Sequence, residues 1–183
     1  MKTPLTLGLL TVAVLGLGVP DGKQSKGGAS KESTRLEALK ERHGSLITIG
    51  SCSIGQVEGT GCTLFVSAQD IFSAQDGARA YGIVVMLIDA TTHGLPLSYI
   101  DDDEIDGLLQ ALTRFDSLKK ADATKLDDLL SMYTTKSGLR VQLSDKFCVT
   151  CGSGFAQLPP EALTKFRSLL ASAKTRLDAV QKS

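Results

Sequence analysis

SYIDDDEIDGLLQALTRF, residues 98–115, carries five acidic side chains within six positions and joins strand-like to helix-like sequence. Asp101 is predicted as the N-cap of a helix, because its carboxylate can accept a hydrogen bond from a backbone N–H two or three residues later. Glu104 then stands at the third helical position, as in a capping box, and Ile100 with Ile105 forms a hydrophobic staple. The helical period continues through Leu108, Leu109, Leu112 and Phe115. We therefore expect these acids mainly to start a helix.

Calcium binding is the first alternative for this stretch. Counted from Asp102, the acids and Gly107 match the first, third, fifth and sixth positions of an EF-hand loop. The twelfth position, however, is Thr113 where the motif needs a bidentate Glu. The structural assignment is therefore favoured, with metal or partner binding as the alternatives. It leaves Asp106 as the one acid without a structural role.

The sequence before this stretch predicts one short helix and four strands. Thr34 and Glu37 fit a capping box at the start of a helix that ends near His43 and Gly44. Short runs rich in β-branched and aromatic residues predict strands, the last at a sheet edge where Pro96 is tolerated: residues 46–50, 62–68, 81–90 and 95–100. We expect connections at SCSIGQVEGTG (51–61), SAQDIFSAQDG (67–77) and the turn TTHG (91–94).

The sequence after the acidic stretch repeats the plan of strands followed by a helix. Residues 118–130 are ambiguous and in part helical, and 132–152 predict three strands joined by two tight turns. The segment PPEALTKFRSLLASAKTRLDAVQ (159–181) predicts a helix that docks on the sheet through one apolar stripe: Leu163, Phe166, Leu170, Ala173, Leu177 and Val180. We expect one α+β domain over 34–183, an antiparallel sheet with amphipathic helices packed on it, in two similar halves.

The first 33 residues predict export. Lys2 precedes an apolar run of 15 residues, Leu5–Val19, which is shorter than the roughly 20 residues of a spanning helix. Residues 1–18 are therefore predicted as a signal peptide or an N-terminal anchor, and 19–33 as a flexible linker rich in Gly, Ser and Lys. The expected location is periplasmic, cell-surface or extracellular, with membrane contact only through an uncleaved N-terminal segment.

Four cysteines, Cys52, Cys62, Cys148 and Cys151, form an even set in a chain predicted to be exported. Disulfides are therefore expected, with all three pairings open. Cys148 and Cys151 also have the spacing of a redox or zinc pair. A redox pair needs a helix N-terminus to lower a thiol pKa, whereas strands are predicted here, and a four-cysteine zinc site usually uses two close pairs.

Composition and motifs exclude several functions. The chain has 20 basic and 20 acidic residues, no Trp and no basic stripe, so nucleic-acid binding is not expected. No catalytic, cofactor-binding or metal-binding residue is assigned. We expect a small exported binding or scaffolding domain without catalytic activity, with a protein or small-molecule partner. One alternative is a metal- or thiol-dependent enzyme that uses Cys148, Cys151 and a histidine, His43 or His93. Another is a ligand pocket between the sheet and the C-terminal helix.

Two resemblances accompany these patterns. The order helix, strands, helix, strands, helix resembles the fold of type III secretion chaperones and their relatives. YIDDDEIDGLL (99–109) and SGLRVQL (137–143) resemble short exported bacterial proteins that carry a YIDxDEI-type segment after a strand and before a helix. This second likeness covers residues 81–145. It implies export, and the family has no known activity to transfer.

Overall fold

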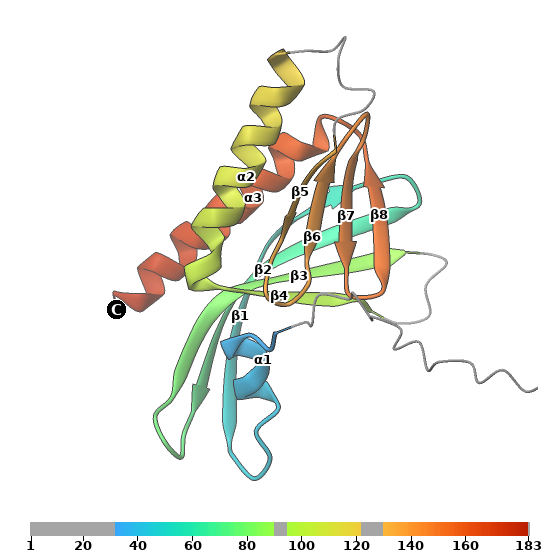
Figure 1. Cartoon of the computed structure of the whole chain (residues 1–183). Helices are drawn as coiled ribbons and strands as arrows, with labels where there is room; N and C mark the ends of the chain where they lie inside the picture. Colours follow the sequence, from blue (N-terminus) through green and yellow to red (C-terminus); the bar gives the residue numbers. More distant parts are fainter. Residues whose placement is uncertain (1–31, 90–94, 122–129, 183) are drawn as a thin grey trace, which may run out of the picture.

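The computed structural model describes residues 32–89, 95–121 and 130–182, which form two antiparallel sheets and three helices (Figure 1). Each sheet has four strands in chain order. Sheet A contains β1 (Ile47–Glu58), β2 (Cys62–Ser73), β3 (Arg79–Asp89) and β4 (Leu97–Asp101), and sheet B contains β5 (Ser131–Thr134), β6 (Arg140–Leu143), β7 (Phe147–Cys151) and β8 (Gly154–Leu158). The helices are α1 (Arg35–Lys40), α2 (Asp102–Ala121) and α3 (Ala162–Gln181). The predicted α+β class is confirmed, but the strands divide between two sheets.

One face of sheet A builds the main core. In the register of β2 and β3, Val66 lies opposite Val85 and Leu64 opposite Leu87, and all four are buried. Because strand side chains alternate between faces, these residues point to the same side. Helix α3 packs on β1, β2 and β3 from that side and lies beside α2 (Figure 1). The apolar stripe of α3 is buried from Leu163 to Leu177, so the predicted docking on the sheet is confirmed.

The short helix α1 covers part of the opposite face of sheet A. Leu36 and Leu39 form a second buried cluster there with Ile71 and Ala80. Thr34 accepts from the backbone of Glu37 and the Glu37 carboxylate accepts from Thr34, as the capping box predicts. The helix ends at Lys40 rather than at His43. Sheet A is therefore packed on both faces at this end.

A thiol and a glycine join sheet B to sheet A. The Cys151 sulfur lies 3.2 Å from the carbonyl oxygen of Val85 and 3.4 Å from that of Pro96. A Cβ on Gly154 would stand 2.6 Å from a methyl carbon of Leu87, so only glycine permits this approach. One apolar cluster runs through both sheets, α2 and α3. The end of β7 is thus fastened beside β3 and β4.

Several predicted boundaries are wrong, and for β1 the structure shows why. Residues 51–58 and 67–73 belong to β1 and β2 instead of connections, and β8 was not predicted. The glycines of β1 suggested a loop, but Gly55 sits where a Cβ would be 2.8 Å from a Leu169 methyl, at an irregularity in the strand register. Close packing of α3 therefore explains the glycine.

Other predictions fall on residues outside the described ranges. They concern the signal peptide or anchor, the linker up to residue 31, the turn TTHG and residues 122–129. Among the helices that are described, none has the length and apolar character needed to cross a membrane.

Gly82 supplies the first test of this packing. A Cβ at this position would lie 2.2 Å from the Ile100 carbonyl oxygen and 2.3 Å from a Leu36 methyl. Gly82→Ala should therefore lower the free energy of unfolding by about 1–3 kcal/mol, measured by urea denaturation. Gly50→Ala is the matched control, since its nearest atoms would be 3.7 Å away. Equal effects of the two substitutions would contradict the close contact between α1 and β3.

Candidate functional site

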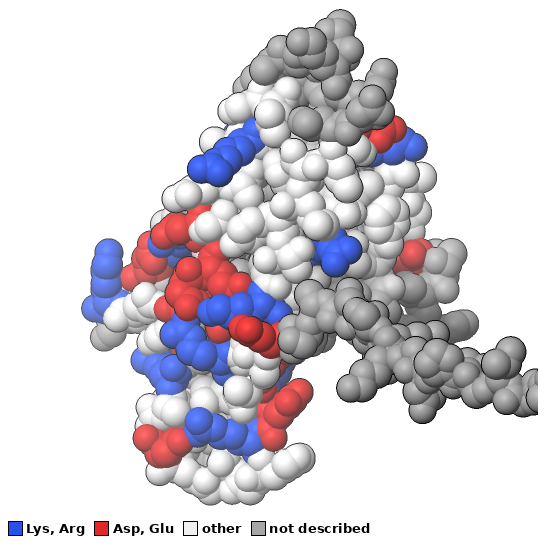
Figure 2. All heavy atoms as spheres, viewed as in Figure 1, with Lys and Arg blue, Asp and Glu red and all other residues white. Residues whose placement is uncertain are grey.

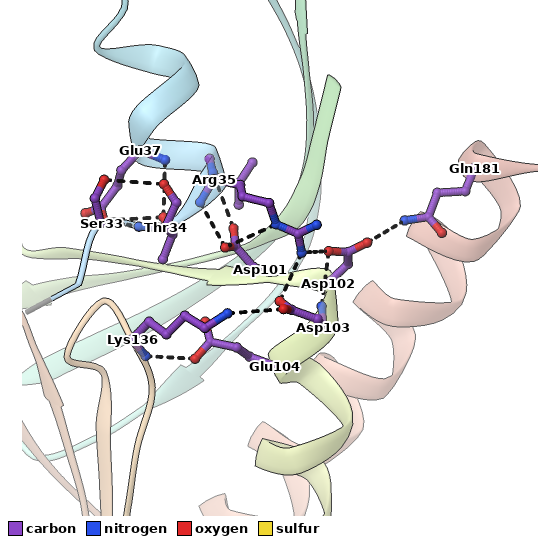
Figure 3. A network of polar contacts seen from close by, with 11 residues as sticks. Ser33, Thr34, Arg35, Glu37, Asp101, Asp102, Asp103, Glu104, Lys136 and Gln181 are labelled. Atoms are coloured by element: carbon purple, nitrogen blue, oxygen red, sulfur yellow. Dashed lines mark hydrogen bonds and ion pairs between the residues drawn. The ribbon is translucent and has the colours of Figure 1, made fainter. Parts of the chain in front are cut away.

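The acidic stretch lies at a corner where four parts of the chain meet. It spans the end of β4 and the first turn of α2, and its side chains reach α1, the turn between β5 and β6, and the last turn of α3 (Figure 3). We call residues 101–104, with Arg35, Lys136 and Gln181, the acidic corner. Each carboxylate of this corner has a different set of partners.

Asp101 caps a helix, but not the helix that follows it. Its side chain is about 2% exposed, and its two oxygens accept hydrogen bonds from the backbone N–H groups of Arg35 at 2.9 Å and Leu36 at 3.3 Å. These are the first residues of α1, where backbone donors have no partner within the helix. Asp101 is a helix cap, as predicted, but the prediction that it caps α2 is wrong because it caps α1. The positive end of α1 and a 3.5 Å contact to the Arg35 guanidinium compensate the buried charge.

Glu104 does not complete a capping box. One carboxylate oxygen accepts from the backbone N–H of Lys136 at 2.7 Å, so it satisfies a donor in the turn after β5. The other oxygen is buried and makes no hydrogen bond within the described part of the chain. The predicted role fails because the side chain points across to sheet B instead of back along its own helix. Figure 3 shows this direction clearly.

The outer acids connect separate helices. Asp102 pairs with Arg35, accepts from Gln181 at 3.2 Å, and accepts from the backbone of Asp103 at 3.1 Å, which satisfies a donor at the start of α2. Asp103 contacts Arg35 at 3.0 Å and Lys136 at 3.1 Å. Partial burial opposes ionisation of Asp103, but these two cations outweigh it and hold the pKa of this carboxyl below its usual value.

Asp106, which the sequence left without a role, pairs with Lys174 of α3 at 3.6 Å. All five acids thus have partners from the protein itself. Within the described ranges, no three metal-ligating side chains come together as a metal site would require. The acidic corner is therefore built as a structural junction.

The cysteines are four free thiols, none at bonding distance from another, so the structure contradicts the expected disulfides. Cys52 lies opposite Ala68 in the register of β1 and β2. Ala68 is six residues further along β2 than Cys62, so the two thiols are far apart on the sheet. Cys148 and Cys151 are three apart in one strand, so they point to opposite faces of β7. The even number of cysteines in the sequence does not indicate which faces of the strands the thiols occupy.

The same geometry separates the parts of the alternative enzyme. Burial, with the nearby Asp145 carboxylate, raises the pKa of the Cys148 thiol, which keeps it protonated at neutral pH. Cys151 is buried between the sheets. His43 is exposed just after α1, and His93 falls outside the described ranges. The two thiols therefore do not form a chelating or redox pair.

The outer face of sheet B and a cavity on sheet A are among the surfaces that these contacts leave open. The outer face of sheet B carries Met132 and Phe155, which are 52% and 53% exposed. A cavity of about 210 Å³ lies between β1, β2 and the end of α3. Sequence reasoning named the second location but not its residues, because a cavity depends on which small side chains the register brings together.

No known protein family, curated protein or solved structure matches the chain. The function is therefore argued from the geometry of these surfaces.

The cap by Asp101 is open to a direct test. Asp101→Ala leaves two backbone donors of α1 without a partner, so the free energy of unfolding should fall by about 1–3 kcal/mol. The amides of Arg35 and Leu36 should exchange faster with deuterium. Asp106→Ala is the control and should cost less than about 1 kcal/mol, since its side chain is 66% exposed. A Tm that rises strongly with added calcium would contradict the structural assignment.

The free thiols make a second prediction. In the native protein, iodoacetamide should label only the half-buried Cys52 and Cys148, and the buried Cys62 and Cys151 should react only after denaturation. Mass spectrometry of each cysteine peptide measures this order. A protein that takes up no label even when denatured without reductant would show that disulfides form after all.

Proposed function

We propose that this chain is a small exported domain that acts by binding or scaffolding, without catalysis of its own. We propose further that a protein partner docks on the outer face of sheet B. The observation that carries the proposal is the near absence of charge on this face, whereas ion pairs gather at the acidic corner.

The outer face is defined by the strand register. Two rows of side chains cross the sheet on the side away from the buried Val141 and Val149. The first row is Met132, Gln142, Cys148 and Gln157, and the second is Thr134, Arg140, Thr150 and Phe155. Among these eight residues only Arg140 is charged. In Figure 2 the surface over sheet B is almost entirely uncharged, whereas acidic and basic side chains gather over the acidic corner and α1.

An exposed sheet face of this kind is suited to protein recognition. Phe and Met are enriched at the centres of protein interfaces, where charges are depleted. Amide and hydroxyl side chains supply hydrogen bonds at little desolvation cost compared with charges. β5 also lies at the edge of the sheet and has no charged residue, so it lacks the charged side chains that often protect an edge strand.

Arg140 indicates the chemistry of the partner. A two-fold contact between copies centred on this face would bring two guanidinium groups together, which is unfavourable. A different protein with an uncharged surface and one carboxylate would satisfy Arg140 by a bidentate pair. We therefore favour a heterologous partner.

Export is supported by the sequence alone, through Lys2 and the apolar run Leu5–Val19 that follows it. Fractionation of cells that express the full chain tests it. Recovery of an uncleaved chain in the cytosol would overturn this part of the proposal and leave the binding surface to be tested separately.

Site-specific crosslinking tests the binding surface. A photoreactive phenylalanine at position 155, in cells that express the full chain, should give an adduct of one defined mass. The same group at position 72 is the control, since Phe72 is 39% exposed but lies on sheet A. With the captured partner purified, Phe155→Ala should weaken binding at least tenfold, about 1.4 kcal/mol. An adduct of twice the chain mass would indicate a second copy, and equal adducts from both positions would contradict the proposed face.

A further inference from the structure

We infer that the cavity between β1, β2 and the end of α3 binds a small monocarboxylate with a short apolar chain. This cavity is separate from the outer face of sheet B, so the inference goes beyond the proposed function and does not depend on it. Three observations support the assignment: the small side chains that form the floor, the apolar wall of α3, and the uncompensated cation at the rim.

The floor of the cavity is made of small residues brought together by register. Gly50 lies opposite Asp70 and Cys52 opposite Ala68 on the face of sheet A that α3 covers. Neither glycine, cysteine nor alanine is large enough to fill the space under the helix. Leu177 and Val180 of α3 line the side of the cavity that faces the helix with apolar side chains. The result is an open hollow that is mostly apolar inside.

Its size limits the ligand. The cavity has a volume of about 210 Å³. An apolar cavity of roughly 150 Å³ is enough to bind benzene. A chain of about six carbons therefore fits, whereas a long acyl chain or a nucleotide would not be enclosed. This range describes short aliphatic or single-ring acids.

The charge at the rim selects an anion. Arg176 lines the cavity and is exposed, and it makes no hydrogen bond or ion pair with the described residues. Asp70 also lines the cavity, but it is held by the Arg79 guanidinium, with its Nε 2.8 Å from a carboxylate oxygen. The negative charge of Asp70 is therefore compensated, while no described residue compensates the positive charge of Arg176. A guanidinium binds a carboxylate by two parallel hydrogen bonds.

A ligand of this class would place its carboxylate at Arg176 and its chain over Ala68, Leu177 and Val180. Removal of the chain from water favours binding, and this contribution grows with each CH₂ group that is buried. The carboxylate adds selectivity, because an amine would be repelled by the arginine. Cys52 belongs to the floor of the same cavity, so its reactivity reports whether the cavity is filled.

The first experiment compares three probes of equal chain length with the full chain. Hexanoate, 1-hexanol and hexylamine are titrated by NMR, with the methyl signals of Leu177 and Val180 as the readout. Hexanoate should bind at least tenfold more tightly than hexylamine, with hexanol between them. Arg176→Gln should reduce hexanoate to the level of hexanol and leave hexanol unchanged. Arg114→Gln, on an exposed arginine of α2, is the matched control and should change neither.

The second experiment fills the cavity. Gly50→Val adds a side chain where the nearest atoms to a Cβ are 3.7 Å away, so the fold should be kept while binding of all three probes is lost. Hexanoate should also slow alkylation of Cys52 by iodoacetamide several-fold in the unmodified chain. Cys148, which lies on sheet B, is the internal reference and should react at an unchanged rate.

Two results would overturn the inference. One is equal affinity for hexanoate and hexylamine, and the other is hexanoate binding that survives both Gly50→Val and Arg176→Gln. An acetylated tripeptide with a C-terminal leucine distinguishes the two sources of such a carboxylate. Tighter binding of the peptide than of hexanoate identifies a chain end as the ligand, and the reverse identifies a free acid.

Discussion

The buried carboxylate of Asp101 is the constraint on which the N-terminal half of the structure depends. An ionised carboxyl group taken out of water must be compensated by nearby donors or cations, or folding becomes unfavourable. Here two backbone N–H groups of α1 and the Arg35 guanidinium provide that compensation. The short helix is therefore held at one place on sheet A. That place brings Leu36 over Gly82, which has no side chain to oppose it, and buries the second apolar cluster.

The other acids of the acidic corner orient the segments that meet there more than they contribute to the free energy of unfolding. Each exposed ion pair contributes little, because water and salt screen it. Together, however, Asp102 and Asp103 contact α1, the turn after β5 and the end of α3, which are distant in sequence. The apolar cluster that runs through both sheets supplies the cohesion. The corner then fixes how the two halves meet at the end of β4, and the Cys151 thiol joins them near the start of β4.

The local patterns of α1 and α3 were predicted well, whereas the local capping box at Glu104 and the contacts that depend on strand register were not. The capping box of Thr34 and the apolar stripe of α3 are local, and both are confirmed. Asp101 was recognised as a capping residue, but its target lies 66 residues away, which no local rule can identify. The cysteine count predicted disulfides, yet alternation along β7 places Cys148 and Cys151 on opposite faces. The cavity escaped residue-level prediction because Gly50 and Ala68 matter only once β1 and β2 are aligned.

The distribution of charge separates the parts of the molecule that hold the fold from those that remain open. The acids at the corner are engaged by Arg35, Lys136 and neighbouring backbone, so a ligand there would have to compete with existing contacts. A ligand on the outer face of sheet B or in the cavity under α3 would not compete with the ion pairs of the corner. Each also retains one arginine, Arg140 or Arg176, beside apolar side chains. The proposed protein surface and the proposed ligand cavity lie on different sheets, so substitutions in one can be tested without altering residues of the other.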